Sequence, residues 1–378
     1  MPGCLLVYHR PMVQVIADAA PRSALARVLS KGAERWPAAP ACSAEEWLDC
    51  AGREDVVAIV EKRLREGLAG VPDAVRAAFS AAVRDEVARL MVRQSEGRRV
   101  LARLKAAGLP LLLLKGSALA YWAYPEPHLR HCQDVDLLFA TRADGLAAAA
   151  VLAEDGYGVR QHFGGAASRE FLCVREVAGA ARVEFDMHWA LSSAPVFADR
   201  FAFVELMAAS IALPALAPGA RGLCAVHALL HACLHRASDL SSGGGEKLKW
   251  LYDLHLLAGA LDAADWEQLR ALAAERGLAG VCAEGLSEAE RLLGTALPEA
   301  SMAALRLAAA DETIDAGRLR GWLYFQRQNL RALPGWRSRA RWVWQRLHPT
   351  AHYREDVGVA GAGLVGDRIR RALRQLRR

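Results

Sequence analysis

Hydrophobic positions change their spacing twice along the chain, and the two changes divide the sequence into three parts. Between Asp73 and Ala107 apolar residues recur at three- and four-residue steps, which predicts a helix. The apolar run Leu111–Leu114 is continuous, as in a buried strand, and a second strand is predicted at Val135–Phe139. After Pro195 the helical spacing returns. We therefore expect a helical part, a small sheet, and a second helical part.

Helices and strands alternate in the middle part of the chain. A helix is predicted at Ala118–Tyr124, ended by Pro125, and another at Ala143–Glu154. Three further strands follow, and Gly164-Gly165 suits a loop between two of them. These strands are Tyr157–Gln161, Phe171–Val174 and Arg182–Trp189. The order of elements predicts an α/β or α+β core.

The domain organisation follows from these boundaries. We place a helical N-terminal arm at residues 1–107, the core at 108–195, a helical C-terminal domain at 196–348 and a basic tail at 349–378. A length of 378 residues is ample for such a division. The helices expected after Pro195 are Phe197–Ala209, Gly222–Ala237, Glu246–Ala260, Asp265–Arg276, Gly280–Leu293 and Ser301–Asp311.

Charge adds a basic C-terminus to this picture. The net charge is +6, but fourteen arginines, no lysine and three acidic residues lie between Arg320 and the end. Such a segment could contact nucleic acid, anionic lipid or an acidic partner, although we favour a solvated helix surface. Tryptophans and arginines interleave between Leu319 and His348. They could stack on nucleobases, but we favour a buried tryptophan seam with outward arginines.

The remaining composition is that of an ordinary globular protein. The chain is 53% hydrophobic and 24% charged, which suffices to fill cores. None of its eight cysteines has the CxxC spacing of zinc ribbons or thioredoxin-like sites. We see no apolar run of about 18 residues that could span a membrane, and Arg10 interrupts any signal peptide. We expect a cytoplasmic protein.

A turn suited to phosphate is the first candidate site. Lys115, Gly116 and Ser117 follow the first apolar strand and precede a helix. A glycine there lets the backbone approach a phosphate, the helix N-terminus offers free N–H groups, and the Ser117 hydroxyl adds a donor. Gly-Ser pairs are common in ordinary turns, so this motif needs support from elsewhere.

Two carboxylates supply that support. Asp134 and Asp136 are two residues apart on a predicted strand and therefore share one face, whereas Val135 points to the other. Paired carboxylates on a partly buried strand repel unless a cation lies between them, and Mg²⁺ prefers carboxylates together with phosphate oxygens. The alternative is a strand end in solvent with two incidental aspartates.

A third carboxylate lies on the predicted strand Arg182–Trp189. Strand alternation separates its apolar side chains from a polar set formed by Glu184, Asp186 and His188. We choose Asp186 as the third metal ligand and keep Glu184 in reserve. His188 could orient a phosphate, but we favour a hydrogen bond to its neighbour.

The order of these motifs resembles the DNA polymerase β-like nucleotidyltransferase superfamily: a Gly-Ser turn, an Asp-x-Asp strand and a carboxylate on a later strand. The residues within and around these motifs resemble more closely those of the uncharacterised bacterial nucleotidyltransferase family proteins, over roughly residues 75–350. One departure from the superfamily is Lys115, where many members have a small or apolar residue. The resemblance rests on Leu114-Lys-Gly116, Tyr124-Pro125, Leu129-Arg130, Asp134-Val-Asp136-Leu-Leu, Phe185-Asp-Met-His-Trp189 and Lys249-Trp-Leu-Tyr-Asp253-Leu.

The resemblance implies an α+β fold whose small mixed sheet carries three carboxylates and two Mg²⁺ ions. Asp134 and Asp136 would bridge both ions, and Asp186 would hold the ion that activates the acceptor. A nucleoside monophosphate would pass from a nucleoside triphosphate to an unidentified hydroxyl or amine, with release of pyrophosphate. Nearby cations would help to hold the triphosphate: Lys115 first, then Arg130 and either Lys247 or Lys249.

A histidine stripe and an aspartate lie outside these motifs. His227, His231 and His235 recur at four-residue spacing on one predicted helix. Three ligands on one straight helix rarely close around one zinc ion, so we expect the stripe to face the cleft or pack against the sheet. Asp253 could pair with one of these histidines or with a substrate amine, and we favour a bond between helices.

Two other functions fit the same sequence. A non-catalytic accessory or antitoxin-like protein could retain the fold, and an RNA-tailing enzyme would use the basic tail. The sequence does not choose between a small-molecule acceptor and a peptide or protein acceptor. A nucleic-acid partner is not favoured.

Overall fold

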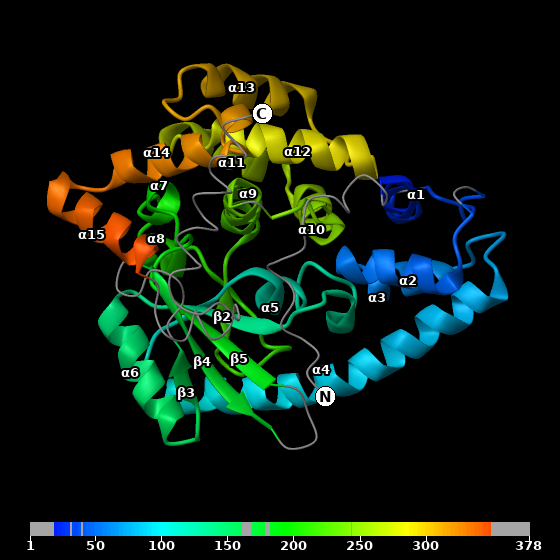
Figure 1. The fold of residues 1–378 in the computed structure, drawn as a ribbon, viewed down its shortest axis with the longest axis horizontal. Helices are drawn as coiled ribbons and strands as arrows, with labels where there is room; N and C mark the ends of the chain where they lie inside the picture. The colour runs from blue at the N-terminus through cyan, green and yellow to red at the C-terminus, as the bar shows by residue number, and fades with distance from the viewer. Residues whose placement is uncertain are drawn as a thin grey trace.

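The computed structural model describes residues 19–30, 32–38, 41–160, 168–177, 182–242 and 244–348. The basic tail at 349–378 and the expected Gly164-Gly165 loop lie outside the described residues. The fold is α+β, as the sequence predicts: a mixed sheet lies between the long helix α4 (Asp73–Ala106) and a group of later helices (Figure 1).

The described strands form one seven-stranded sheet in the order β3-β4-β5-β2-β1-β7-β6. The central pair β2 and β5 is parallel, whereas β1 pairs with β2 and β4 pairs with β5 in antiparallel fashion. The strands are β1 (Leu112–Leu113), β2 (Asp134–Leu138), β3 (Gly158–Arg160), β4 (Glu170–Glu176), β5 (Arg182–His188), β6 (Ile211–Ala212) and β7 (Arg221–Gly222).

Helices surround this sheet. Before it come α1 (Ala19–Leu29), α2 (Ala44–Arg53), α3 (Val57–Arg65) and α4; among the strands lie α5 (Lys115–Leu119), the 3₁₀ turn η2 (Pro127–Leu129) and α6 (Arg142–Ala153). The later helices are α7 (Pro195–Ala198), α8 (Phe203–Ala208), α9 (Ala225–Ser241), α10 (Leu248–Ala260), α11 (Ala263–Glu275), α12 (Ala279–Leu293), α13 (Glu299–Ala310), α14 (Trp322–Ala332) and α15 (Gly335–Leu347). None of the helices described combines the length and apolar character that a membrane crossing requires.

Three local predictions differ from the structure. The expected turn at Lys115 is the first turn of α5, so that helix spans Lys115–Leu119 instead of the predicted Ala118–Tyr124. The expected helix Phe197–Ala209 is interrupted between α7 and α8, because continuous apolar spacing does not reveal a break. Gly222 belongs to β7 instead of starting a helix, since a two-residue strand has too few positions to show a period.

Two hydrophobic clusters hold the fold together. One lies between the sheet, α6 and the last turns of α4, where Val100 and Leu104 are fully buried. The other combines the N-terminal helices with α9 to α13, and it includes Phe79 near the start of α4. The helix α4 therefore contributes to both clusters, and the N-terminal helices share a core with the later ones. The proposed domain boundaries stay a prediction.

Candidate active site

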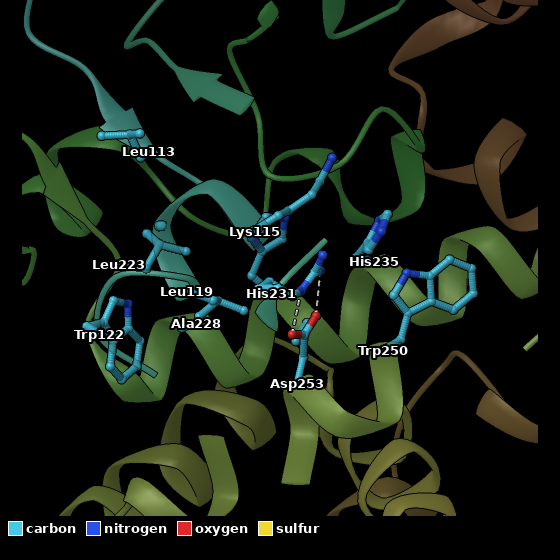
Figure 2. A pocket seen from close by; sticks show the side chains of 13 residues that line it. Leu113, Lys115, Leu119, Trp122, Leu223, Ala228, His231, His235, Trp250 and Asp253 are labelled. Carbon is cyan, nitrogen blue, oxygen red and sulfur yellow. Dashed lines mark hydrogen bonds and ion pairs between the residues drawn. The ribbon is translucent and has the colours of Figure 1, made fainter. Parts of the chain in front are cut away.

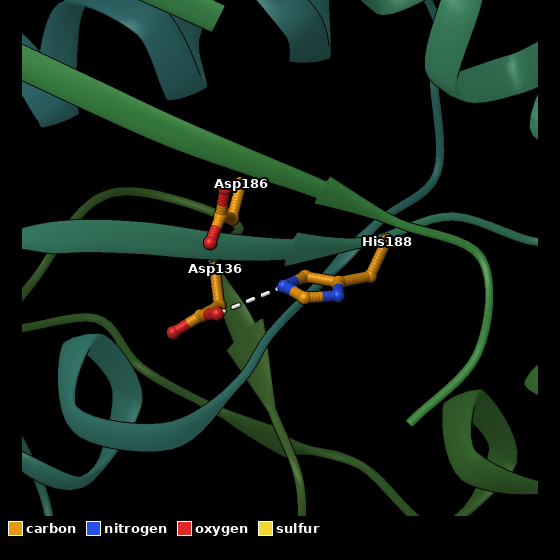
Figure 3. Close-up of side chains that lie close together, drawn as sticks. All are labelled: Asp136, Asp186 and His188. Carbon is orange, nitrogen blue, oxygen red and sulfur yellow. Dashed lines mark hydrogen bonds and ion pairs between the residues drawn. The ribbon is translucent and has the colours of Figure 1, made fainter. Parts of the chain in front are cut away.

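Strand pairing brings together the three carboxylates that the sequence predicts as metal ligands. The parallel register of β2 and β5 places Asp134 opposite Glu184 and Asp136 opposite Asp186. Side chains directly opposite each other in paired strands project from the same face of a sheet. Figure 3 shows Asp136 and Asp186 side by side on that face. The register thus joins two carboxylates that lie on separate segments of the sequence.

The other face of these strands fixes the register. Leu137, Phe185 and Met187 are fully buried in the cluster beneath the sheet. A slip of one residue would turn this apolar set toward the carboxylate face and the carboxylates into the core. Burial of the apolar row therefore determines where the carboxylates point.

Asp136 is buried and contacts two other side chains of the site. It is 3% exposed, and its Oδ1 accepts hydrogen bonds from Lys115 Nζ at 2.6 Å and from His188 Nε2 at 2.8 Å. The second ring nitrogen of His188, Nδ1, lies 3.0 Å from Oε2 of Glu170 on β4. The bond between His188 and a neighbouring side chain, favoured from the sequence, is confirmed.

These side chains form a potential metal site. Ligand atoms of Asp136, Asp186 and His188 all lie within 4.8 Å of one another (Figure 3). Asp134 lies on the same strand face, two residues before Asp136. Carboxylate oxygens in this number are the donors that Mg²⁺ uses in sites where substrate phosphates complete the coordination.

Burial and neighbouring charges both shift the pKa values of the side chains in this cluster. Burial and the neighbouring carboxylates of Asp136 and Asp186 raise the pKa of Asp134 to about 7. Burial would also raise the pKa of Asp136, but Lys115 and His188 outweigh it and hold that pKa far below its ordinary range. Burial would lower the pKa of His188, but its contacts with Asp136 and Glu170 raise it to about 10. A cation between the carboxylates would relieve the repulsion that acts on Asp134.

Comparison with known families agrees with this geometry. The sequence model of a family described as "Uncharacterised nucleotidyltransferase" matches residues 40–294, which is more than half of the 378-residue chain. The chain belongs to this nucleotidyltransferase family. The match confirms the resemblance to an uncharacterised nucleotidyltransferase family. No curated protein matches the chain.

The turn of this nucleotidyltransferase that leads into α5 has an unusual backbone. Lys115 adopts φ = 47°, a left-handed conformation that costs free energy for a residue with a side chain. Its ammonium group reaches Asp136 from there. The hydroxyl of Ser117 is directed back along the chain and donates to the carbonyl of Leu114 at 2.9 Å. The structure thus brings Lys115 to the carboxylates and gives Ser117 a local partner.

Gly116 allows a close approach of two side chains. A Cβ atom at Gly116 would lie 2.6 Å from the sulfur of Cys132 and 2.7 Å from Nη1 of Arg130. Because Arg130 is held by other contacts, we expect Gly116→Ala to destabilise the protein by about 1–3 kcal/mol, as overpacked sites do. Urea unfolding followed by circular dichroism measures this.

A second glycine in a helix provides the control for that prediction. A Cβ added to Gly97 in α4 would meet nothing within 4 Å. Gly97→Ala is therefore expected to stabilise the helix by up to about 1 kcal/mol. Equal unfolding free energies for the two variants would show that Gly116 is not constrained by its neighbours.

Arg130 lies in a buried network that connects the sheet to α10. Its Nε and Nη2 donate to the two carboxylate oxygens of Asp253 at 2.8 and 2.7 Å, and Nη1 donates to the carbonyl of His131. The hydroxyl of Tyr124 donates to the same Asp253 at 2.7 Å. Asp253 on α10 therefore pairs with Arg130 and Tyr124, and both partners lie outside the helices. The favoured bond between two helices is thus wrong, and among the described residues the alternative pairing with a histidine is not found either.

Lys249 is held by the N-terminal part of the chain. Its Nζ lies 2.8 Å from Oδ2 of Asp55, which also contacts Lys247. Asp55 has φ = 56°, a second left-handed backbone at a residue with a side chain. The nearby charge of Lys249 opposes the rise in the pKa of Asp134. Lys249 thus acts on the carboxylates electrostatically while its direct partner is Asp55.

A pocket lies between α5, α9 and α10 (Figure 2). Lys115 lines it, so the pocket adjoins the carboxylate cluster, and its lining also includes His231, His235 and Trp250. Burial lowers the pKa of His231 to about 3 and that of His235 well below its ordinary value. Both rings are therefore neutral near pH 7. The expectation that the stripe faces a cleft is confirmed for these two histidines.

His227 differs from the other two histidines of the stripe. Its Nδ1 lies 3.2 Å from the sulfur of Cys224, and it does not line the pocket. Within the described residues, the metal-ligand cluster found does not include any of the three histidines.

Two contacts of the site were missed from the sequence. Glu170 is the first residue of β4 and faces His188. The strand predicted from the sequence begins only at Phe171, and a polar residue directly before an apolar strand attracts no notice. Asp55 holds Lys247 and Lys249 from a segment almost two hundred positions earlier in the chain. No local pattern could have indicated either contact, because both depend on how distant segments pack.

Proposed function

We propose that this nucleotidyltransferase is an Mg²⁺-dependent enzyme that transfers a nucleoside monophosphate from a nucleoside triphosphate to a hydroxyl or amine acceptor and releases pyrophosphate. The observation that carries the proposal is the register that sets Asp136 opposite Asp186, with Asp134 on the same face. One buried carboxylate and two partly buried ones in the same place are unfavourable unless cations balance their charge.

The donor chemistry of the site fits two Mg²⁺ ions. Asp134 and Asp136 would hold both ions, and Asp186, which lies opposite Asp136 in the register, would hold one of them. Bound ions would balance the charge of the triphosphate and help to deprotonate the acceptor. The rest of the catalytic task is positioning, which the chain's own residues supply.

The cation nearest the carboxylates is Lys115. It is tied to Asp136 by a 2.6 Å contact, and on substrate binding its ammonium group would turn to phosphate oxygens. Gly116 and Ser117 would form the turn beside those oxygens. His188, fixed between Glu170 and Asp136, would keep the Asp136 carboxylate in one orientation.

Arg130 and Lys249 would contribute to triphosphate binding through their charge. Their hydrogen-bond donors are engaged by Asp253 and Asp55. We therefore expect their positive charge to attract the triphosphate without direct contact. The pocket beside Lys115 would receive part of a substrate, and its neutral His231 and His235 offer hydrogen bonds without charge. We place this reaction in the cytoplasm, with a small molecule, peptide or protein as acceptor.

One observation favours a second function. Lys115 and His188 both contact the carboxylate of Asp136 and balance its charge. A non-catalytic accessory protein that keeps the family's fold could hold its carboxylates in this way. This alternative predicts neither transfer nor metal-dependent binding of a triphosphate.

The test is incubation with each α-labelled nucleoside triphosphate, Mg²⁺ and a broad acceptor panel. The wild type is expected to transfer label and release pyrophosphate, and the Asp134→Ala plus Asp136→Ala variant is expected to do neither. Equal release by both proteins would refute the site. If neither releases pyrophosphate, Mg²⁺-dependent thermal stabilisation by a triphosphate in the wild type alone would still support the enzyme. Its absence would support the accessory protein.

A further inference from the structure

Several large apolar side chains of α15 face solvent. Trp336 is 73% exposed, Trp344 62%, Leu347 45% and Val343 40%. With the exposed Ala340 they recur at three- and four-residue spacing and form one continuous face of the helix, which we call the α15 stripe. Scattered exposed apolar residues are normal, but a continuous stripe of this kind marks an interaction surface.

The opposite side of α15 carries a buried tryptophan. Trp342 is 6% exposed, and no other residue described in α15 is buried. The guanidinium carbon of Arg346 lies 4.2 Å from the centroid of the Trp342 ring. The expected buried tryptophan seam is thus wrong for Trp336 and Trp344, which point away from the core. The helix α15 itself lies at the periphery of the molecule (Figure 1).

Arginines border the stripe on both sides. Arg337, Arg339 and Arg341 are exposed. With about 3.6 residues per turn, Arg337 and Arg341 lie on one side of the stripe and Arg339 lies on the other. The helix contains no aspartate or glutamate. An apolar face that includes two tryptophans and has arginine along its edges is the composition of helices that lie in a membrane interface.

We propose that the α15 stripe docks on the surface of an anionic lipid bilayer. The helix would lie in the plane of the interface, with Trp336, Val343 and Leu347 among the upper parts of the acyl chains. The bordering arginines would contact lipid phosphates. Trp344 would occupy the interface itself, where amphipathic rings are enriched. This docking is independent of the catalytic proposal.

Other occupants fit the stripe less well. A second copy of the same surface would bring two sets of like-charged arginines together, which is unfavourable. Single-stranded nucleic acid uses aromatic rings for stacking and has no comparable use for Val343 and Leu347 at the centre of the surface. Charge complementarity together with the aliphatic residues favours anionic lipid.

The experiment is flotation of the full-length protein with vesicles of phosphatidylcholine alone or mixed with phosphatidylglycerol. Binding is expected for the anionic vesicles only. Trp336→Ala plus Trp344→Ala is expected to weaken binding at least about tenfold. Arg337→Gln and Arg341→Gln are expected to weaken it about fivefold each and to flatten its dependence on salt. Thermal unfolding should not change, since the side chains removed are exposed.

A leucine elsewhere on the surface provides the control. Leu307 on α13 is 75% exposed, and Leu307→Ala should bind vesicles like the wild type. The proposal is overturned if the wild type does not bind anionic vesicles, if the tryptophan pair can be removed without effect, or if Leu307→Ala loses binding equally. Tighter stripe-dependent binding to single-stranded RNA would overturn it, as would a stripe-dependent dimer in light scattering without vesicles.

Discussion

Asp186→Asn is expected to lower the rate of nucleotidyl transfer roughly 10²- to 10³-fold, because the variant loses one charge that faces Asp136 in the parallel register. Asparagine keeps the shape of the side chain, so the fold should persist. The Mg²⁺ concentration at half-maximal rate should rise at least about tenfold. Transfer rates at varied Mg²⁺, with the unfolding midpoint measured in parallel, give both results.

Glu184 provides the matched control on the same strand face. It lies opposite Asp134 in the register, and its carboxylate forms an ion pair with Arg182. Glu184→Gln should therefore change the transfer rate only slightly. If Glu184→Gln loses activity and Asp186→Asn keeps it, Glu184 is the third metal ligand and the assignment of Asp186 is wrong.

Asp253→Ala is expected to reduce the free energy of unfolding by about 3–5 kcal/mol, the usual cost of removing one partner from a buried ion pair. The side chain of Arg130 is 7% exposed and that of Asp253 is 5% exposed, so the remaining guanidinium would lack both water and a counter-charge. Tyr124 would also lose the acceptor of its hydroxyl. Urea unfolding followed by circular dichroism measures the loss.

A surface aspartate and a double variant complete that experiment. Asp199 pairs with Arg169 near the surface, where its side chain is 74% exposed, and Asp199→Ala should cost less than about 1 kcal/mol. Combining Arg130→Met with Asp253→Leu should recover part of the lost stability, since no unpaired charge remains. Equal losses for Asp253→Ala and Asp199→Ala would mean that the buried pair does not anchor α10 to the sheet.

Local sequence rules predicted the elements that carry the site. Alternation along β2 and β5 separated an apolar row from a polar row, and the structure has Leu137, Phe185 and Met187 buried on one face. The same rules missed β6 and β7, which have two residues each, and the helical turn at Lys115. Short elements owe their conformation to pairing and packing, which the periodicity of one segment does not contain.

The partners of the site's cations could not be predicted in the same way. The sequence proposed Lys115, Arg130 and Lys249 as separate cations for a triphosphate. The structure pairs Arg130 with a residue 123 positions away and ties Lys249 to Asp55. Both pairs cross between segments that meet only when the helices pack against the sheet. Side-chain type limits which partners are suitable, but packing selects one.

The sequence alone determined the class of this protein and the face of each strand that bears carboxylates, because strand alternation and motif order are local properties of the chain. Only the tertiary structure decided that β2 and β5 are parallel neighbours, which places Asp136 beside Asp186. It also decided that Trp342 is buried and Trp336 exposed. An amphipathic pattern specifies two faces, and the side on which the rest of the protein packs determines which face meets solvent.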